Sequence, residues 1–287
     1  MILTSPAIAL SLEQAHARQL AQQAIHYRDL APGNHGDVLY TAGASAAITE
    51  AAFGRKLNHM VGLGMGAVVT DEDLDGLVRA YAARGMPTEI DLCPHADPSA
   101  LTSLGRTGFS VNAFSNTYVR ALTDDDLVTY LPDHIDVLTE REDTEPRFVA
   151  ASVAGFGGQA QPKPAALLET LARIAMARAD TTLFVAMVDG VAAGSAGMSI
   201  LPSTLGPIAH LYIASTLPAY RGRGIQLALL RARLQAAKRA GCVLASVTAR
   251  PGNGSTRNVE RAGLSLAYTT ATFATLKHEN DCALHAM

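Results

Sequence analysis

The sequence is poor in cysteine and in net charge and has no long apolar run, and each absence excludes a class of protein. Its three cysteines are too few and too scattered for a disulfide framework. The longest apolar stretch, residues 183–200, is interrupted by Asp189-Gly190, a dipeptide typical of hairpin turns, so no membrane-spanning helix is expected. The first residues place no basic side chain before their short apolar run, so a secretion signal is not expected. We therefore predict a soluble, cytoplasmic protein that does not bind membranes.

The net charge is small, but its distribution along the chain is uneven. A formal charge of −3 over 287 residues argues against a protein that binds nucleic acid through bulk charge. Residues 221–261 nevertheless carry nine Lys or Arg residues and a single acid, Glu260. A basic stretch within an otherwise acidic chain indicates a binding site for a small anionic ligand.

Helical and strand-like periodicities alternate along the chain, and an apolar content of 48% is ample for a packed core. Helices are expected over residues 11–27, 70–84, 98–106, 148–156, 164–179, 225–240 and 255–261, the first two capped by Ser11 and Thr70. Strands are expected over residues 38–48, 57–64, 90–93, 109–122, 135–138, 183–188, 191–200, 208–214, 242–247 and 266–276. This order predicts an α/β fold with a mixed sheet flanked by helices.

Acidic residues gather near the middle of the chain and suggest a domain boundary. Residues 123–145 contain nine Asp or Glu residues and one Arg. A boundary in the first part of this stretch predicts one domain over residues 1–125 and a second over residues 126–287, which ends in a short polar tail. The ends of the two halves, residues 86–122 and 242–276, repeat the order strand, turn, short helix, Gly, strand, which indicates a diverged internal duplication.

A glycine-rich turn separates the predicted strand 208–214 from the predicted helix 225–240. It reads Arg221-Gly222-Arg223-Gly224-Ile225-Gln226. Glycines let the backbone approach an anion and direct N–H groups at it, while a helix N-terminus adds a favourable dipole and the arginines add charge. An ordinary helix start with surface arginines is the alternative, but it leaves the neighbouring strand and the basic stretch as coincidences. The pattern therefore predicts a phosphate-binding turn.

The sequence around this turn resembles the GNAT (GCN5-related) N-acetyltransferase superfamily. The hallmark of that family is Arg/Gln-x-x-Gly-x-Gly/Ala after the fourth strand, and Gln226 stands here where relatives have a small residue. The segments TLPAY at 216–220, QLALLRARLQAAKRAG at 226–241 and SxRNxERxGL at 255–264 are also similar to the family. The resemblance covers roughly residues 133–276.

The resemblance implies a sheet splayed beside its fourth strand, with acetyl-CoA or another acyl-CoA in the cleft as co-substrate. Main-chain groups of the fourth strand would pair with the pantetheine arm: Ile213, Ala214, Ser215 and Thr216. The turn would hold the pyrophosphate through Arg221, Gly222, Arg223, Gly224, Ile225 and Gln226. Asn253 and Asn258 would lie near the other end of the cofactor.

The N-terminal half also resembles a GNAT domain, through the segment LNHMVGLGMG at 57–66. At the place of the pyrophosphate turn it has four carboxylates, Asp71, Glu72, Asp73 and Asp75, at a helix start. Carboxylates there satisfy the helix dipole and repel a pyrophosphate. We therefore predict a degenerate GNAT-like half without a CoA site, which either forms a wall of the substrate site or serves as scaffold.

Acyl transfer to an amine needs a base for the amine, donors for the developing oxyanion and a proton for the leaving thiolate. The resemblance places the amides of residues 214–216 as oxyanion donors. His210 is the only strong titratable group on the predicted fourth strand, and it is either the base or a packed histidine. Many relatives carry, at the position of Val259, a tyrosine that donates a proton to the leaving thiolate. Valine cannot donate one, so the proton is expected to come either from Tyr268 on the next strand or from solvent.

The sequence thus predicts an N-acetyltransferase that moves an acetyl group from acetyl-CoA directly to a small-molecule amine. Two alternatives stay open, a catalytically weak acyl-CoA-binding sensor and an acetyltransferase that acts on a protein amine. A homodimer is compatible with the sequence. No metal site is expected, because His278, Cys282 and His285 lie in an unpatterned tail.

Overall fold

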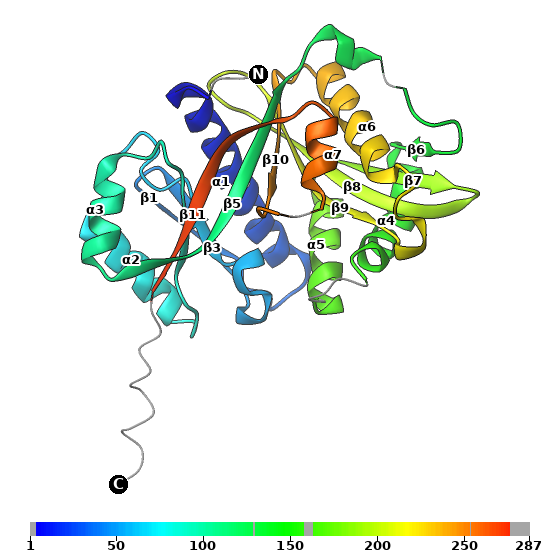
Figure 1. Cartoon of the computed structure of the whole chain (residues 1–287). Helices are drawn as coiled ribbons and strands as arrows, with labels where there is room; N and C mark the ends of the chain where they lie inside the picture. Colours follow the sequence, from blue (N-terminus) through cyan, green and yellow to red (C-terminus); the bar gives the residue numbers. More distant parts are fainter. Residues whose placement is uncertain (1–3, 129, 158–162, 253, 276–287) are drawn as a thin grey trace.

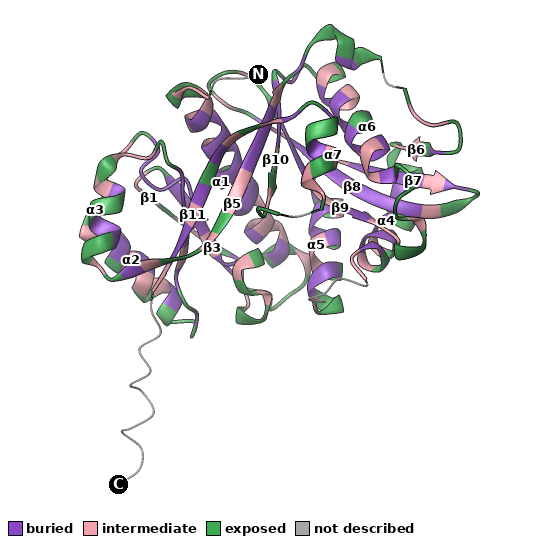
Figure 2. Cartoon of the chain, in the orientation of Figure 1, coloured by how far each residue is buried: buried purple, intermediate pink, exposed green. Residues whose placement is uncertain are grey.

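One continuous sheet of eleven strands forms the centre of the molecule, in the order β1-β2-β3-β4-β11-β5-β10-β9-β8-β7-β6 (Figure 1). The computed structural model describes residues 4–128, 130–157, 163–252 and 254–275. The predicted polar tail with its two histidines and one cysteine lies outside these ranges. Figure 2 shows β8 and β9 buried along most of their length, so the core of the C-terminal half sits on these strands.

The strands and helices have the following bounds. The strands are β1 Asp37–Thr41, β2 Ala44–Ile48, β3 His59–Val61, β4 Glu89–Leu92, β5 Phe109–Ala121, β6 Asp136–Leu138, β7 Thr181–Val188, β8 Val191–Leu201, β9 Ile208–Thr216, β10 Leu244–Ala249 and β11 Ser265–Thr275. The α-helices are α1 Pro6–Leu30, α2 Asp71–Ala82, α3 Pro98–Arg106, α4 Arg141–Gly155, α5 Ala165–Ala177, α6 Ile225–Arg239 and α7 Thr256–Arg261. Three short 3₁₀ helices are η1 Ala51–Lys56, η2 Asp124–Leu127 and η3 Pro218–Tyr220.

Most predicted elements are present, and the differences have local causes. The first helix begins at Pro6 because Ser5 caps it, its Oγ accepting from the Ile8 N–H at 3.3 Å, whereas Ser11 is buried inside the helix. The predicted strand 38–48 is a hairpin, since Ala42 and Gly43 adopt φ values of 44° and 80° that turn the chain. The helix predicted over 148–156 begins earlier, at Arg141, and continues through a proline.

The two halves exchange their last strands. β5 belongs to the N-terminal half but lies between β10 and β11, and β11 lies between β4 and β5. The pairings are symmetric: β3 with β4 and β9 with β10 are parallel, while β4 with β11 and β10 with β5 are antiparallel. The order β4-α3-β5 therefore matches β10-α7-β11, as the internal duplication predicts. The boundary between residues 125 and 126 stays a prediction, because both segments build one sheet.

Helices cover both faces of this sheet. Alternate residues of β7 show the two sides, since Phe184 packs with the α6 residue Leu229 and Val185 packs with Phe148 of α4. α1 shares the face of α4 and α5, where it contacts β1, β2 and β3 at one end and β8 and β9 at the other. In the described part of the chain, no helix is both long enough and apolar enough to cross a bilayer.

The exchange predicts that neither half folds alone. In a fragment of residues 1–125, β5 has lost both neighbours, and in a fragment of residues 126–287 the same is true of β11. Unpaired strand edges lead to unfolding or aggregation. We expect each fragment alone to lack a cooperative thermal transition, and the two expressed together to co-elute as a 1:1 complex in size-exclusion chromatography. Cooperative unfolding of either isolated fragment near the melting temperature of the whole chain would contradict this expectation.

Candidate functional site

The parallel strands β9 and β10 separate soon after they begin. They pair only from Ile208–Leu244 to His210–Ser246. Beyond these residues β9 continues to Thr216 along β8, and β10 continues to Ala249 along β5. We call the diverging segments, residues 211–216 and 247–249, the β9–β10 fork. It is the splay that the sequence resemblance predicts beside the fourth strand.

A bulge shapes the β9 arm of this fork. The register between β8 and β9 shifts between Ser195 and Gly197, and Ile213 has a φ of 48° there. The left-handed region is strained for a β-branched residue, and such strain in a well-packed strand is a signature of functional sites. A Cβ on Gly197 would come within 3.0 Å of the Ile213 Cγ2, so a glycine makes room for the bulge. The bulge takes Ile213 and Ala214 out of the ladder with β8, at the place where the pantetheine arm is predicted.

The glycine-rich turn follows the end of β9 and leads into α6. Gly222 and Gly224 have φ values of 80° and 84°, which glycine adopts without strain. Gly224 is the N-cap of α6, and no side chain caps this helix and no acid lies in its first turn. The first N–H groups of a 15-residue helix are therefore free to bind an anion.

The side chains around this turn mostly hold the protein together. The Arg221 guanidinium donates to the carbonyl oxygens of Gly155 at 3.2 Å and of Gly157 at 2.7 Å, which ties the end of α4 to the turn. Arg223 lies over the Tyr220 ring, 5.1 Å from its centre. The predicted contribution of this turn to a cofactor therefore falls mainly on its backbone.

Three further predicted residues have different positions around the turn. Ile225 is buried, so it offers only its main chain. Asn258 Nδ2 donates to Gln226 Oε1 at 2.6 Å, which joins α7 to α6. This hydrogen bond gives the Gln226 side chain a partner, at a position where relatives have a small residue. Asn253 lies outside the described residues.

The corresponding turn of the N-terminal half is closed by carboxylates. Thr70 caps α2, its Oγ1 accepting from the Asp73 N–H at 3.3 Å while Asp73 accepts from the Thr70 N–H at 2.9 Å. Asp71 and Glu72 also lie in the first turn. Thr70 satisfies the Asp73 N–H, and the carboxylates interact favourably with the helix dipole and repel a further anion. The absence of a CoA site in this half stays a prediction, and the geometry agrees with it.

His210 lies at the point where β9 and β10 separate. It is buried, and its Nδ1 is 3.4 Å from the Oγ of Ser246 on β10. Its ring meets the ring of His16 edge-on, with 4.7 Å between the centres. Burial, followed by the charges of His16, Arg178 and Arg233, keeps the pKa of His210 well below its ordinary value. His210 is therefore neutral at neutral pH.

His210 and Tyr268 belong to one buried polar cluster, although their strands are not neighbours. His16 Nε2 lies 3.4 Å from the Ser246 Oγ, and His16 Nδ1 lies 4.0 Å from Glu13 Oε1. Tyr268 then donates to Glu13 Oε1 at 2.7 Å. We call Glu13, His16, Ser246, His210 and Tyr268 the α1 cluster, because α1 connects its members.

Glu13 and His16 are not among the residues that the sequence pattern singled out. They are three residues apart on a helix whose apolar side includes their neighbours Leu12 and Ala15, and both are buried. Two ionisable side chains beside an apolar helix face are a signal that could have marked them. Their partner strands, however, lie more than 200 residues away along the chain.

Burial sets the charge state of the α1 cluster. It raises the pKa of Glu13 to about 7, against the opposing hydrogen bond from Tyr268, and Asp91 raises it further. Burial also lowers the pKa of His16 to about 4, which the Asp91 charge only partly offsets. The pKa of Tyr268 is strongly raised by burial and by the nearby Glu13. A phenol so placed is a poor proton source, so its role as acid stays a prediction.

Val259, which the sequence singled out, and Tyr212 are both part of the packing. Val259 is buried in the core of the C-terminal half. Tyr212 lies near His210, with 6.0 Å between the ring centres, and its hydroxyl is 2.9 Å from the Thr181 Oγ1. Tyr212 is half-buried and therefore reaches both the core and the fork.

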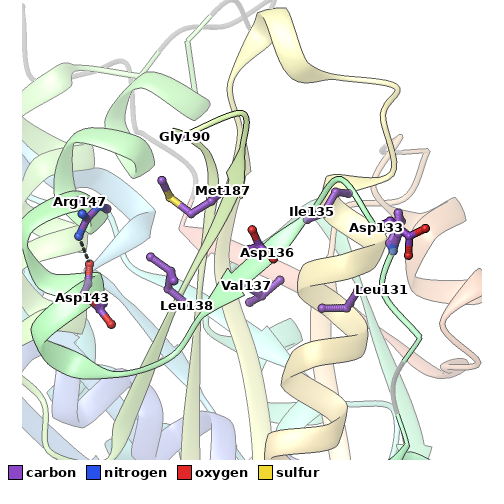
Figure 3. Close-up of a pocket in the computed structure, with 11 residues that line it drawn as sticks. Leu131, Asp133, Ile135, Asp136, Val137, Leu138, Asp143, Arg147, Met187 and Gly190 are labelled. Carbon is purple, nitrogen blue, oxygen red and sulfur yellow. Dashed lines mark hydrogen bonds between the residues drawn. The ribbon is translucent and has the colours of Figure 1, made fainter.

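A pocket of about 880 Å³ lies away from the fork, around the edge strand β6 (Figure 3). β6 is three strands from β9. Three carboxylates, Asp133, Asp136 and Asp143, line this pocket, and their charge opposes a phosphorylated ligand. No group of three or more His, Cys, Asp or Glu side chains in the described ranges is arranged to hold a metal ion.

The family comparison agrees with the C-terminal site. Residues 142–263 match the model of the acetyltransferase (GNAT) family. The matched segment includes β9, the glycine-rich turn, α6 and β10. The resemblance of this half is therefore confirmed, and the segment is an acyltransferase domain of the GNAT family. A search of curated proteins found no match.

Solved structures share the fold over most of the chain. A GCN5-related N-acetyltransferase from Kribbella flavida has a TM-score of 0.62 at 16% identity, over 90% of this chain and 95% of its own. A tandem GNAT protein from the clavulanic acid biosynthesis pathway has a TM-score of 0.60 at 14% identity, over 88% of this chain and 87% of its own. A GCN5-related N-acetyltransferase from Sphaerobacter thermophilus has a TM-score of 0.52 at 15% identity, over 95% of this chain and 94% of its own. These matches confirm the predicted fold class.

The charge state of Glu13 predicts a pH-dependent stability. The pKa of Glu13 is about 7 in the folded chain and 4.5 as the ordinary value, so its stabilising protonated form is fully present below pH 4.5 and is lost as the pH rises through 7. A Glu13→Gln variant stays neutral throughout. We expect its free energy of unfolding to exceed that of the wild type by about 3 kcal/mol more at pH 8 than at pH 4.5.

Urea unfolding of both proteins between pH 4.5 and pH 8 measures this difference. A His16→Gln variant is the matched control with the opposite pH dependence, because the lowered pKa of His16 gives stability that is fully present above pH 6.5 and is lost as the pH falls toward 4. Parallel stability curves for the wild type and Glu13→Gln would show that Glu13 is not held as a neutral acid.

Proposed function

We propose that the C-terminal half transfers an acetyl group from acetyl-CoA directly to an amine of a small molecule. The observation that carries the proposal is the β9–β10 fork, whose bulged arm leads directly to the uncapped start of α6. In an acyl-CoA the thioester is followed by the pantetheine arm and then by the pyrophosphate. The bulged arm of β9 suits the pantetheine arm, and the uncapped start of α6 suits the pyrophosphate. The GNAT family match over residues 142–263 supports the same assignment.

The cofactor would bind mainly through the backbone. The bulge frees Ile213 and Ala214 from the ladder with β8, so their amides are available to the pantetheine arm as an added strand would use them. The pyrophosphate would lie against the N–H groups of residues 222–226, where both glycines allow a close approach. Arg221 and Asn258 would act indirectly, by holding α4 and α7 against this turn.

The reaction joins the amine nitrogen to the acetyl carbon and breaks the bond from that carbon to sulfur. The amine gives up one proton, and the CoA thiolate takes up one proton, so charge and atoms balance. Amides of Ala214 to Thr216 would stabilise the oxyanion that develops on the acetyl oxygen. Positioning of the two substrates in the fork would supply a large share of the rate.

His210 is the proposed base, because it is neutral and lies where the two strands of the fork separate. Its low pKa means that it holds a proton only briefly. Ser246 and His16 connect it to Glu13, whose pKa of about 7 lets it bind that proton at neutral pH. α1 of the N-terminal half would thereby take part in the chemistry of the C-terminal half.

A CoA-binding sensor with little turnover is the second candidate. The low pKa of His210 favours it, because a weakly basic imidazole is a poor acceptor for an ammonium proton. The buried Val259 in place of a proton-donating tyrosine favours it as well. Binding of acetyl-CoA without thiol release across a broad amine panel would establish the sensor over the enzyme.

Gly224→Asp should abolish CoA binding. The new carboxylate would stand at the N-cap of α6 and repel the pyrophosphate, so we expect the dissociation constant for CoA to rise at least about 100-fold. Isothermal titration calorimetry measures the change. Gly224→Asn has the same shape and the same positive φ without the charge, so it separates repulsion from backbone strain.

An exposed acid at the start of α2 provides the control for the prediction that the N-terminal half has no CoA site. Asp75 forms part of the carboxylate group at the start of α2 and is exposed. We expect Asp75→Asn to leave the stoichiometry of one CoA per chain and its affinity unchanged. Unchanged CoA affinity in Gly224→Asp, or a second CoA equivalent in the wild type, would contradict the proposed site.

His210→Gln tests the base. Loss of general-base catalysis lowers kcat about 100-fold or more, while CoA affinity should stay the same because the backbone binds the cofactor. A stopped assay of thiol release across pH 6 to 9 measures kcat. If the variant only loses stability and keeps its kcat, His210 is a packed histidine and the alternative reading of the sequence holds.

A further inference from the structure

The side-chain amide of Gln19 is buried and has no hydrogen-bond partner among the described residues. Gln19 lies on α1, one helical turn after His16, and is only 5% exposed. Neither its Oε1 nor its Nε2 takes part in a hydrogen bond. A buried amide without partners costs free energy, and native structures keep few such groups. A bound group that supplies the missing partners would recover this cost.

A series of hydrogen bonds connects Gln19 to the β9 arm of the fork. The Gln19 carbonyl oxygen accepts from Arg178 Nη1 at 3.4 Å. The Arg178 carbonyl oxygen accepts from the Thr181 N–H at 3.4 Å, and the Thr181 Oγ1 lies 2.9 Å from the Tyr212 hydroxyl. Tyr212 is one of the fork residues. The segment that leads into β7 therefore links α1 with the β9 arm.

The same arm leads back to α1 through His210. The rings of Tyr212 and His210 are stacked with 6.0 Å between their centres, and the His210 ring meets the His16 ring at 4.7 Å. His16 is one turn before Gln19, on the same side of α1. Contacts from two directions thus place Gln19 beside the start of the β9 arm, one helical turn from the residue that touches the proposed base.

Two further groups without partners lie around this part of the fork. The Ser152 Oγ is fully buried on α4 and makes no hydrogen bond. The residue before it, Ala151, accepts at its carbonyl oxygen from the Ser215 Oγ of the fork at 3.4 Å. The Glu13 Oε2, one turn before His16 on α1, is also buried without a partner. Three residues with unused hydrogen-bonding atoms therefore accompany the β9 arm on the face of α1 and α4.

The residues that connect Gln19 with the fork offer no free cation. Arg178 is fully buried and donates to both carboxylate oxygens of Asp180 at 2.8 Å. Burial lowers the pKa values of His16 and His210 and keeps both neutral at neutral pH. A substrate carboxylate or phosphate would find no counter-charge among these residues. A neutral amide is suited to a hydroxyl or to another amide, whose burial costs much less than that of an ion.

We propose that Gln19 binds an uncharged hydrogen-bonding group, a hydroxyl or a carboxamide, on the amine that accepts the acetyl group. This inference rests on the proposed function and adds the class of acceptor to it. Nε2 donates and Oε1 accepts, so the site favours such a group over an alkyl group of the same shape. The glycine-rich turn follows the far end of the β9 arm, so the pyrophosphate would not reach Gln19.

Pairs of amines with the same shape test the proposal on the full chain. Serinol and pentan-3-amine differ in their hydroxyls, and L-alaninamide and 3-methylbutan-2-amine differ in the carboxamide. Because the members of a pair also differ in basicity, the readout is the change in preference that Gln19→Leu causes. We expect the ratio of kcat/KM between the polar and the apolar member of at least one pair to fall about 10-fold or more in this variant. The pair that responds distinguishes a hydroxyl from a carboxamide.

The stability of Gln19→Leu separates a binding group from a structural one. Leucine has a similar size and leaves no buried amide without partners, so we expect the melting temperature to rise by about 2 °C or more. The dissociation constant of CoA should stay the same. Gln19→Met, which keeps the unbranched shape, should give the same results. Gln14→Leu makes the same substitution at a half-buried position on another side of α1, and as the control it should not change the preference.

Each other outcome overturns the inference or separates it from the proposed function. An unchanged preference in both pairs overturns it, and a lower melting temperature in addition assigns Gln19 to the packing. A weaker CoA affinity in Gln19→Leu also overturns it, because it assigns the amide to the cofactor. If the chain binds CoA but acetylates no amine, the proposed function fails, and calorimetric titration of the CoA-bound protein with serinol and with L-alaninamide decides the inference alone. Binding that Gln19→Leu weakens about 10-fold or more supports it, and any other result overturns it.

Discussion

The antiparallel pairing of β5 with β11 is the constraint on which the rest of the structure depends. Each strand is the last of its half of the chain, and both neighbours of each strand belong to the other half. Backbone N–H and C=O groups at the centre of a sheet have to be paired. The two halves therefore form one sheet with an approximate two-fold relation about this pair, and the positions of the helices follow from it.

The shared sheet allows an element of one half to serve the other. α1 lies across the junction, from β1 and β2 at one end to β8 and β9 at the other, and brings Glu13 and His16 to His210. Burial of such groups without full compensation is costly, so the pKa of His16 is lowered and His16 is neutral near pH 7, while the raised pKa of Glu13 makes it titrate near pH 7.

The two related helix starts show how side-chain chemistry decides whether a helix N-terminus is capped or left uncapped. α2 begins with Thr70, which accepts from the Asp73 N–H, and with three acids whose charges suit the helix dipole. α6 begins at Gly224, whose positive φ and missing side chain leave those groups free. The same position in a duplicated fold is thus closed in one half and open in the other.

The sequence by itself determined what depends on a few neighbouring residues. Thr70 as a helix cap, Asp189-Gly190 as a hairpin turn and Gly222 with Gly224 as a glycine turn before a helix follow from local φ preferences and short-range hydrogen bonds, and the structure has each in place.

The exchange of β5 and β11 and the joining of His210 to Tyr268 through α1 were decided only by the tertiary structure. They bring together residues from distant segments, with more than 200 residues between Glu13 and Tyr268. Local preferences have no information on such pairings, because their free energy comes from burying a common core and completing one sheet.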